Sequence, residues 1–198
     1  MLVLIAGDLH IPHRTSCIPA QFRKLLAPNK VQHTLITGNL CLKEQYEYFF
    51  SLCNDVHVVK GDFDEENYPT EKVINIGGYK IGLIHGHQIV PFGDKEAFLA
   101  VQRRLDTDIL VSGHTHQMSS WEDQGKLFLN PGSITGAYTG FTAQVVPSFM
   151  LLDITESGIC VYMYELKENM SINRIYFGGP STKPSSSLDT PNEEKCED

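Results

Sequence analysis

The chain opens with Met1-Leu2-Val3-Leu4-Ile5-Ala6-Gly7-Asp8-Leu9-His10, an apolar run that turns polar after a glycine. Residues 2–6 are typical of a buried strand, because they are continuously apolar and stop at a turn residue. Asp8 and His10 stand one residue apart just beyond this strand, so both side chains can turn toward a common point. This stretch predicts a strand that brings a carboxylate and an imidazole to one edge of a sheet.

Further polar motifs follow later predicted strands in the same way. They are Gly38-Asn39, Gly61-Asp62-Phe63-Asp64, Gly86 between His85 and His87, and Gly113-His114-Thr115-His116. Because strand ends in an open α/β sheet converge on one crevice, we expect the motifs to share a site. The glycines before the motifs (Gly7, Gly38, Gly61, Gly113) are expected to free the backbone for the turn out of the sheet.

The spacing of apolar residues predicts an α/β fold. Strands are expected at 2–6, 34–37, 55–59, 72–76, 79–84, 109–112, 119–122, 126–129, 149–154, 159–166 and 172–177, and helices at 20–26, 43–53 and 95–105. The early strand–helix alternation implies parallel pairing, whereas the later strands follow one another without helices. We predict two stacked mixed sheets flanked by helices in one domain, 1–177. Residues 178–198 are predicted to form a disordered, Pro- and Ser-rich acidic tail.

Composition excludes several classes of partner. A net charge of −8 over 198 residues argues against nucleic acid, which attracts basic surfaces, and against direct docking on anionic lipid. No apolar run approaches the roughly 20 residues that a membrane span needs, so direct membrane insertion is not expected. The five cysteines are scattered without a C-x-x-C pair, which indicates reduced thiols rather than a zinc ribbon or a disulfide framework.

The five motifs supply a mixed ligand set. The candidate metal ligands are Asp8, His10, Asn39, Asp62, His85, His114 and His116. Carboxylate, amide and imidazole groups suit divalent ions such as Zn, Mn or Fe, with Mg as a further candidate, so the set predicts up to two such ions. Each motif alone is a weak signal, since a single histidine after a strand is more often packed or solvated. Their number and order carry the prediction.

The order D-x-H, G-[DN], G-[ND]-x-D, G-H and G-H-x-H resembles the calcineurin-like metallophosphoesterases over residues 1 to about 135. The resemblance implies a four-layer sandwich of two sheets and flanking helices. It implies one metal held by Asp8, His10 and His116, a second by Asp62, His85 and His114, and Asn39 between them. His85 is preferred to His87, because it comes directly off a strand.

Three positions depart from the pattern of the active enzymes in this family. Asn39 stands where the bridging ligand is normally Asp, Asp62 where Asn is usual, and Phe63 where a catalytic histidine is expected. Phe63 can neither donate a proton nor hydrogen-bond a phosphate, and losing a general acid typically costs about 10²–10⁴ in rate. These departures predict a non-catalytic protein. The alternative is a weak or specialised metal-dependent phosphoesterase that uses another acid, such as His13 or His87.

A closer resemblance, over residues 1–14, 37–41, 59–64, 82–88, 130–133 and 135–138, is to a branch of this family that serves as a scaffold in the retromer complex. It implies a cytoplasmic protein, peripheral on endosomes through its complex, in endosome-to-Golgi transport. The implied partners are the large α-solenoid subunit and regulators of the sorting-nexin or Rab-regulator type.

Two apolar surfaces are candidates for these partners. The large subunit is expected on the side of the metal cleft, at Leu25, Leu26, Phe63, Val90 and Phe92; regulators are expected on the opposite side, at Leu151, Tyr162, Tyr164 and Ile172. Tyr162 and Tyr164 stand at period two in a predicted strand and so share one face. Burial in the core is the alternative for each of these residues.

Overall fold

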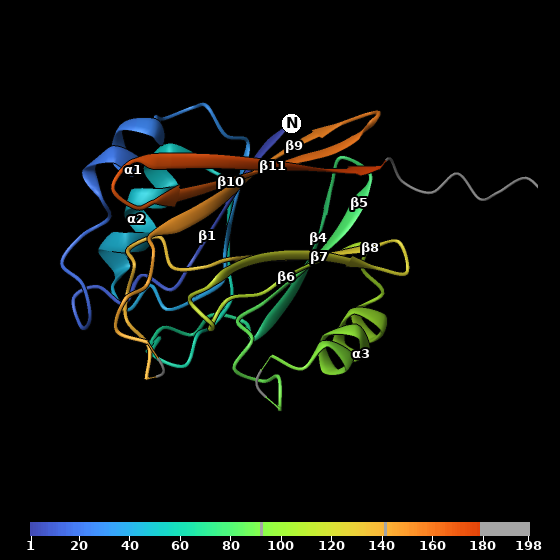
Figure 1. Ribbon diagram of the computed structural model, residues 1–198, viewed down its shortest axis with the longest axis horizontal. Helices are drawn as coiled ribbons and strands as arrows, with labels where there is room; N and C mark the ends of the chain where they lie inside the picture. The colour runs from blue at the N-terminus through green and yellow to red at the C-terminus, as the bar shows by residue number, and fades with distance from the viewer. Residues whose placement is uncertain (92, 141, 179–198) are drawn as a thin grey trace, which may run out of the picture.

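The computed structural model describes residues 1–91, 93–140 and 142–178, which form two stacked β-sheets with helices on their outer sides (Figure 1). The strands are β1 Leu2–Ala6, β2 His33–Ile36, β3 Val56–Val58, β4 Glu71–Ile76, β5 Tyr79–Ile84, β6 Ile109–Val111, β7 Met118–Asp123, β8 Lys126–Pro131, β9 Ser148–Thr155, β10 Gly158–Leu166 and β11 Met170–Gly178. The helices are α1 Ala20–Leu25, α2 Lys43–Leu52 and α3 Lys95–Leu105. Each predicted element is present, with its ends within two residues of those expected.

The first sheet has the order β11-β10-β9-β1-β2-β3. β1, β2 and β3 are parallel, because the chain crosses over through α1 and α2, whereas β9, β10 and β11 are antiparallel neighbours. β1 joins the two halves through antiparallel pairing with β9, in a register that places Leu4 opposite Leu151. The carboxyl ends of β1, β2 and β3 therefore lie at the same edge of the sheet, where the polar loops that follow them can meet.

The second sheet has the order β4-β5-β6-β8-β7. β5, β6 and β8 are parallel, and the antiparallel strands β4 and β7 lie at its edges. The hairpin from β4 to β5 turns at Gly77-Gly78, both with positive φ, as the Gly-Gly pair predicts. This sheet is mixed like the first, which confirms the predicted two-sheet sandwich.

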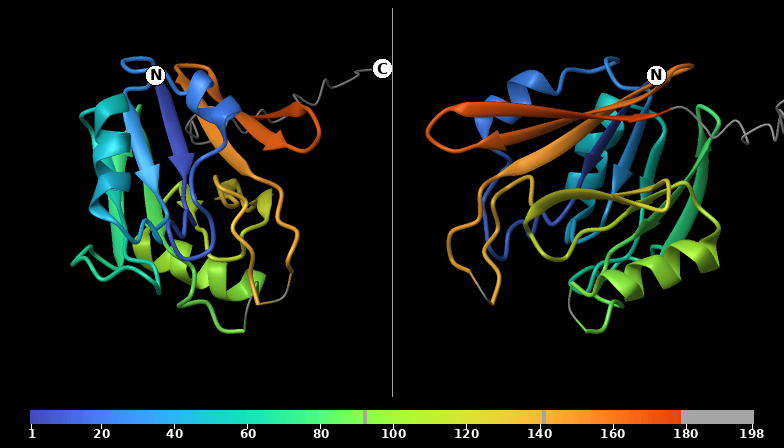
Figure 2. Two further views of the ribbon diagram at one scale, coloured as in Figure 1. Left: turned by 90° about the vertical axis from the view of Figure 1, so that its left-hand side faces the viewer. Right: turned by 45° about the vertical axis from the view of Figure 1, so that its right-hand side comes forward.

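The main core lies between the sheets, where Val3, Ile5 and Leu35 of the first sheet face Ile81 and Val111 of the second, all fully buried. Helices α1 and α2 cover the outer side of the first sheet, and α3 covers the second (Figures 1 and 2). A separate apolar cluster under α3 contains Leu99 and Phe128. The helices thus complete the four layers.

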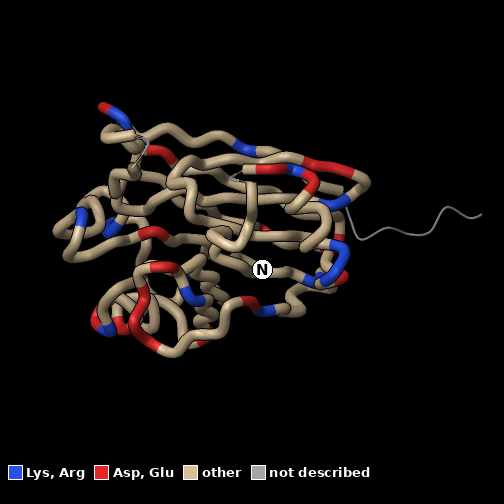
Figure 3. The backbone as a smooth tube through the Cα atoms, turned by 90° about the horizontal axis from the view of Figure 1, so that it is seen from below, with Lys and Arg blue, Asp and Glu red and all other residues tan. Residues whose placement is uncertain are grey.

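Charged residues of both signs are interspersed along the backbone rather than sorted into one basic face in the view of Figure 3. Within the described ranges, no helix is long and apolar enough to cross a membrane. Phe92 and the segment 179–198, which carry two of the expectations from sequence, lie outside the described residues.

The position of α1 corrects one expectation. Leu26 is only 7% exposed and belongs to the outer core of the first sheet, which also contacts Leu151 and Tyr164. Both views of Figure 2 place α1 beside the N-terminal end of β1, away from the carboxyl ends of the parallel strands. Leu25 and Leu26 therefore do not lie on the side of the metal cleft, because the chain must return from α1 to the amino end of β2.

Candidate metal centre

The polar motifs meet at the carboxyl ends of the parallel strands of both sheets. Asp8 and His10 follow β1, Asn39 follows β2, Asp62 follows β3, His85 follows β5, and His114 and His116 follow β6. Stacking the two sheets face to face brings these ends together, so one cleft receives side chains from both sheets. The motifs that follow separate strands therefore lie together at one cleft.

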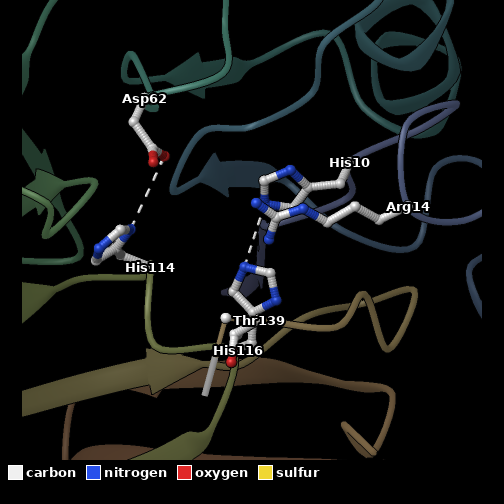
Figure 4. A pocket seen from close by; sticks show the side chains of 7 residues that line it. His10, Arg14, Asp62, His114, His116 and Thr139 are labelled. Carbon is white, nitrogen blue, oxygen red and sulfur yellow. Dashed lines mark hydrogen bonds and ion pairs between the residues drawn. The ribbon is translucent and has the colours of Figure 1, made fainter. Parts of the chain in front are cut away.

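The side chains divide into two groups. Asp8, His10 and His116 each offer a ligand atom within 4.8 Å of the others, and so do Asp62, His85 and His114. We call the first the enclosed group, since all its members are buried, and the second the open group, since Asp62 and His114 reach solvent. Figure 4 shows His10 facing His116 and Asp62 facing His114 across the cavity.

Asn39 lies between the groups, as the family resemblance implies. Its Nδ2 is 3.4 Å from Asp8 Oδ1 in the enclosed group and 2.9 Å from Asp62 Oδ1 in the open group. The same nitrogen is 3.1 Å from His10 Nε2 and 3.3 Å from His85 Nε2. One carboxamide therefore touches both groups.

Backbone carbonyls orient two of the imidazoles. His85 Nδ1 donates to the carbonyl oxygen of Thr37 over 2.7 Å, and His116 Nδ1 donates to that of Ala137 over 2.6 Å. In each ring the donating nitrogen is thereby fixed, which directs Nε2 at the cleft. His87, the alternative to His85, is exposed and belongs to neither group.

The backbone adopts unusual conformations at the ligands. Asp8, His10, Asn39, His114 and His116 all have φ between 49° and 69°, although none is glycine. A non-glycine residue in this left-handed region costs on the order of 1–3 kcal/mol and persists where the surroundings enforce it. Such strain gathers at sites where side-chain placement matters more than local stability.

The glycines serve a purpose other than the one expected from sequence. Of the four that precede the motifs, only Gly38 has a positive φ. A Cβ on Gly113 would lie 2.4 Å from Thr37 Oγ1 and 2.8 Å from Asp8 Oδ2, and one on Gly61 would lie 2.1 Å from Asn39 Oδ1. These glycines are needed because ligand side chains pass directly over them.

Burial and neighbouring charges set the protonation of the ligands. Burial, aided by the positive charge of Arg14, lowers the pKa of His10 to about 3, so its ring is neutral near pH 7. Burial acts to raise the pKa of Asp62, but hydrogen bonds from His85 and Asn39 hold it below its usual range. Burial also acts to lower the pKa of His85, but the hydrogen bond with Asp62 and the charge of Asp8 raise it.

The donor set fits a pair of divalent cations. Each group offers one carboxylate and two imidazoles, the mixture that Zn and related ions accept. His10 Nε2 and His116 Nε2 lie 3.2 Å apart, and Asn39 Nδ2, with two hydrogens, lies within 3.4 Å of two carboxylate oxygens and two imidazole nitrogens. Cations between these atoms would resolve that mismatch. When bound, they would polarise an oxygen ligand and acidify a bound water.

Phe63 forms the rim of the centre, as its polar neighbours in sequence suggest. Its side chain is 45% exposed, and its ring meets that of His10 edge-on, with centroids 5.0 Å apart. The guanidinium of Arg14 lies 4.6 Å from the Phe63 ring centroid and donates through Nη1 to the carbonyl oxygen of Tyr138 over 2.8 Å. Arg14 also lines the cavity, of about 100 Å³. Sequence reasoning did not single out Arg14, which belongs to no ligand pattern.

Asp64 was not assigned a role either, although it belongs to the quoted Gly61–Asp64 motif. Its carboxylate accepts from the backbone N–H of Asn39 over 2.7 Å, of Gly61 over 2.9 Å and of Cys41 over 2.9 Å. The second acidic residue of the motif is the signal that could have identified it. Asp64 positions Asn39 and belongs to neither ligand group.

The segment after β8 braces the first ligand loop. Ser133 Oγ donates to the carbonyl oxygen of Asp8 over 2.7 Å, and Thr135 Oγ1 donates to that of Leu9 over 2.8 Å. Asn130 Nδ2 donates to the carbonyl oxygen of Gly113 over 2.9 Å. The 130–135 segment therefore holds the loops of both D-x-H and H-x-H in place.

Comparisons with known proteins agree with this geometry. Residues 1–157 match the family model of the calcineurin-like phosphoesterase superfamily domain. The vacuolar protein sorting-associated protein 29 of Schizosaccharomyces pombe is 39% identical over 171 residues, which cover 84% of this chain and 91% of that protein.

Solved structures of the same protein from other organisms are also similar. The wild-type protein of Entamoeba histolytica, complexed with Zn²⁺, has a TM-score of 0.85 and 49% identity, covering 90% of this chain and 100% of its own. The Cryptosporidium parvum protein has a TM-score of 0.86 and 40% identity, covering 89% and 97%. This chain therefore belongs to the calcineurin-like phosphoesterase superfamily and, within it, to the family of vacuolar protein sorting-associated protein 29.

Proposed function

We propose that this protein is a non-catalytic scaffold subunit of the retromer complex, acting in endosome-to-Golgi protein transport. The observation that carries the proposal is Phe63 at the rim of the metal centre, where the enzymes of this family place a catalytic histidine. An exposed aromatic ring cannot protonate a leaving alkoxide, but it offers apolar area to a protein partner. Family membership supports the same role.

The metal-cleft side would bind the large α-solenoid subunit, vacuolar protein sorting-associated protein 35. Val90 supports this assignment, because its side chain is 79% exposed although Ile89 beside it is buried under α3. Val90 comes three residues after His87 in sequence, and Phe63 lies at the rim of the cleft. Aliphatic and aromatic side chains that remain in water near a structured cleft suit a protein interface. Phe92 completes the predicted set but lies outside the described residues.

The outer face of the antiparallel half of the first sheet would bind regulators of the sorting-nexin or Rab-regulator type. The register pairs Tyr162 with Leu151 and Tyr164 with Ile172, so these four side chains share one face. Ile172 is 55% exposed, whereas Tyr164 stacks on buried Phe149 with ring centroids 4.6 Å apart. The patch therefore combines anchored and exposed members, and α1 with Leu25 lies on the same outer side.

The proposal places the protein in the cytoplasm and on endosomes only through its complex. Val90→Asp is expected to weaken binding of the purified large subunit by at least about 30-fold, since a central apolar contact is worth about 2 kcal/mol or more. Pull-down and calorimetry with the full chain measure this loss.

Ile172→Asp is the matched control, because it makes the same kind of change at an exposed aliphatic residue on the other surface. It is expected to bind the large subunit as wild type does. Circular dichroism establishes that both variants are folded. Equal loss in both variants, or no binding by the wild type, would overturn the assignment of the cleft side.

A second candidate function is a weak metal-dependent phosphoesterase, favoured by the two oriented ligand groups. Under the scaffold proposal, hydrolysis of a phosphomonoester with added Mn²⁺ or Zn²⁺ is the same for wild type and Asp8→Ala. Phe63→His is expected to raise the rate by up to about 10²–10⁴ if only the acid is missing. Wild-type hydrolysis that disappears in Asp8→Ala would instead support the enzyme.

A further inference from the structure

A second D-x-H pattern lies far from the metal centre. Asp55-Val56-His57 enters β3, and His33 begins β2, which pairs with β3 in parallel. The register places Thr34 beside Val56 and Leu35 beside His57, so His33 lies beside Asp55. Residues two apart in a strand point to the same side, so His33, Asp55 and His57 share one face of the sheet. This cluster lies at the amino ends of the strands whose carboxyl ends carry Asn39 and Asp62.

The ligand atoms of this cluster are as close together as those of the metal centre. His33, Asp55 and His57 each offer one such atom within 4.8 Å of the others. His33 Nδ1 lies 2.5 Å from Asp55 Oδ2, and His57 Nε2 lies 3.1 Å from Asp55 Oδ1. Ligands of a tetrahedral zinc ion, with bonds of 2.0–2.2 Å, stand roughly 3.3 Å apart. The separation between His57 and Asp55 is close to this value, whereas the hydrogen bond between His33 and Asp55 is shorter and would lengthen when an ion binds.

His57 is only partly satisfied by polar contacts within the described part of the chain. Its Nδ1 is buried there without a hydrogen-bond partner, whereas its Nε2 lies 3.1 Å from Asp55 Oδ1 in an ion pair. Leaving a buried polar atom unpaired is costly, commonly about 1–3 kcal/mol. A cation shared with Asp55 would replace the ion pair at His57 Nε2 with a coordinate bond.

The backbone around the cluster is held by its own contacts. Thr34 N–H donates to the carbonyl oxygen of Asp55 over 2.9 Å, and the Asp55 N–H donates to Cys53 Sγ over 3.3 Å. The Cys53 thiol in turn donates to the carbonyl oxygen of Gln32 over 2.9 Å. These bonds fix the turn before β3 against the start of β2, so the ligands need little rearrangement. The Asp55 side chain remains 48% exposed, which gives an ion a route from solvent.

We propose that His33, Asp55 and His57 form a further divalent-metal site, suited to Zn²⁺, independent of the centre at the strand carboxyl ends. Two imidazoles and a carboxylate are a preferred zinc set, and three protein ligands leave one coordination position for water or for a group of a partner molecule. Because β3 is the edge strand of its sheet, the bound ion would join this edge to β2.

The test uses Zn²⁺ alone on the full chain labelled with ¹⁵N. Long-range spectra report the imidazole nitrogens directly, so the cluster is read separately from the metal centre. Zn²⁺ is expected to shift the ring nitrogens of His33 and His57 to values typical of metal-bound imidazole, and to do so equally in Asp62→Ala. Ring nitrogens of His33 and His57 that do not respond to Zn²⁺ would overturn the proposal.

Equilibrium dialysis of variants gives a second measurement. His57→Gln and His33→Gln are each expected to bind one equivalent of Zn²⁺ fewer than wild type. His13→Gln, which changes an exposed histidine outside all three ligand groups, is expected to retain the wild-type number. An unchanged number in folded His57→Gln contradicts the site. If that variant does not fold, the wild-type spectra decide.

Discussion

The two ligand groups of the metal centre differ in their access to water. In the enclosed group the side chains of Asp8 and His116 are 0% and 2% exposed, whereas in the open group those of Asp62 and His114 are 34% and 27% exposed. An ion in the enclosed group is surrounded by fixed ligands in a low-dielectric setting, while one in the open group keeps contact with solvent. Similar ligand sets can therefore give two positions of unequal affinity and exchange rate.

The largest effect is expected from Asp8→Ala. This change removes the carboxylate of the enclosed group, and its Zn²⁺ affinity should fall by more than about 100-fold, since even outer partners of a ligand are worth 10–100-fold. It also leaves the His114 N–H, which donates to Asp8 Oδ2 over 2.8 Å, without its acceptor. The free energy of unfolding should then fall by about 1–3 kcal/mol.

Calorimetry with Zn²⁺ and urea unfolding measure the two quantities for Asp8→Ala. Asp153→Ala serves as the control, because Asp153 is a partly exposed carboxylate at the opposite end of β1, beside the amino terminus. Wild-type affinity and stability in Asp8→Ala would mean that the enclosed group does not hold an ion.

A smaller effect is expected from Asp62→Ala in the open group. Affinity at this position should fall by about 10–100-fold, because water can replace the missing carboxylate. Since Asp62 is partly exposed, the unfolding free energy should change by no more than about 0.5 kcal/mol. The same calorimetric and urea measurements apply. A stability loss equal to that of Asp8→Ala would remove the distinction between the two groups.

The smallest effect is expected from lowering the pH from 7 to 6. Because the pKa of His85 is raised, protons compete with a metal ion for this ring more strongly than for a free imidazole, so metal affinity at the open group falls as the pH falls. Displacement of one proton changes the metal affinity by at most about tenfold per pH unit. His10, whose pKa is about 3, carries no such proton in this range and adds no such dependence to the enclosed group.

Calorimetric titrations of Zn²⁺ at pH 7 and pH 6 resolve the two positions, with Asp62→Ala used to isolate the enclosed group. The expected result is a decrease in Zn²⁺ affinity that is confined mainly to the open group. An equal decrease in affinity at both groups would show that protonation of His85 does not cause the difference in their pH dependence.

The outline of the molecule follows from sequence because its signals are local. Apolar runs ending in Gly and a polar residue locate β1, β2 and β6, and the ligands come immediately after them. The choice of His85 over His87 also needed only the position of the strand end. Properties of this kind depend on a few consecutive residues, which a sequence displays directly.

What sequence reasoning missed depends on contacts across the fold. The requirement for glycine at position 113 arises from Thr37 and Asp8, which approach it from elsewhere in the chain. Arg14 enters the site by stacking on Phe63 and Tyr138. The position of α1, and with it Leu25 and Leu26, depends on which side of the sheet the crossover takes. None of these follows from residue spacing.

The three hydrogen bonds received by Asp64 have a consequence for motion. They join the loop after β2 to the loop after β3, although Asn39 and Asp64 are 25 positions apart in the chain. The two loops should open together as one cooperative unit in amide hydrogen exchange, with the amides of Asn39, Cys41 and Gly61 protected to a similar degree. Asn39 contacts both ligand groups. The loop that carries it can therefore move away only when its hydrogen bonds to Asp64 break.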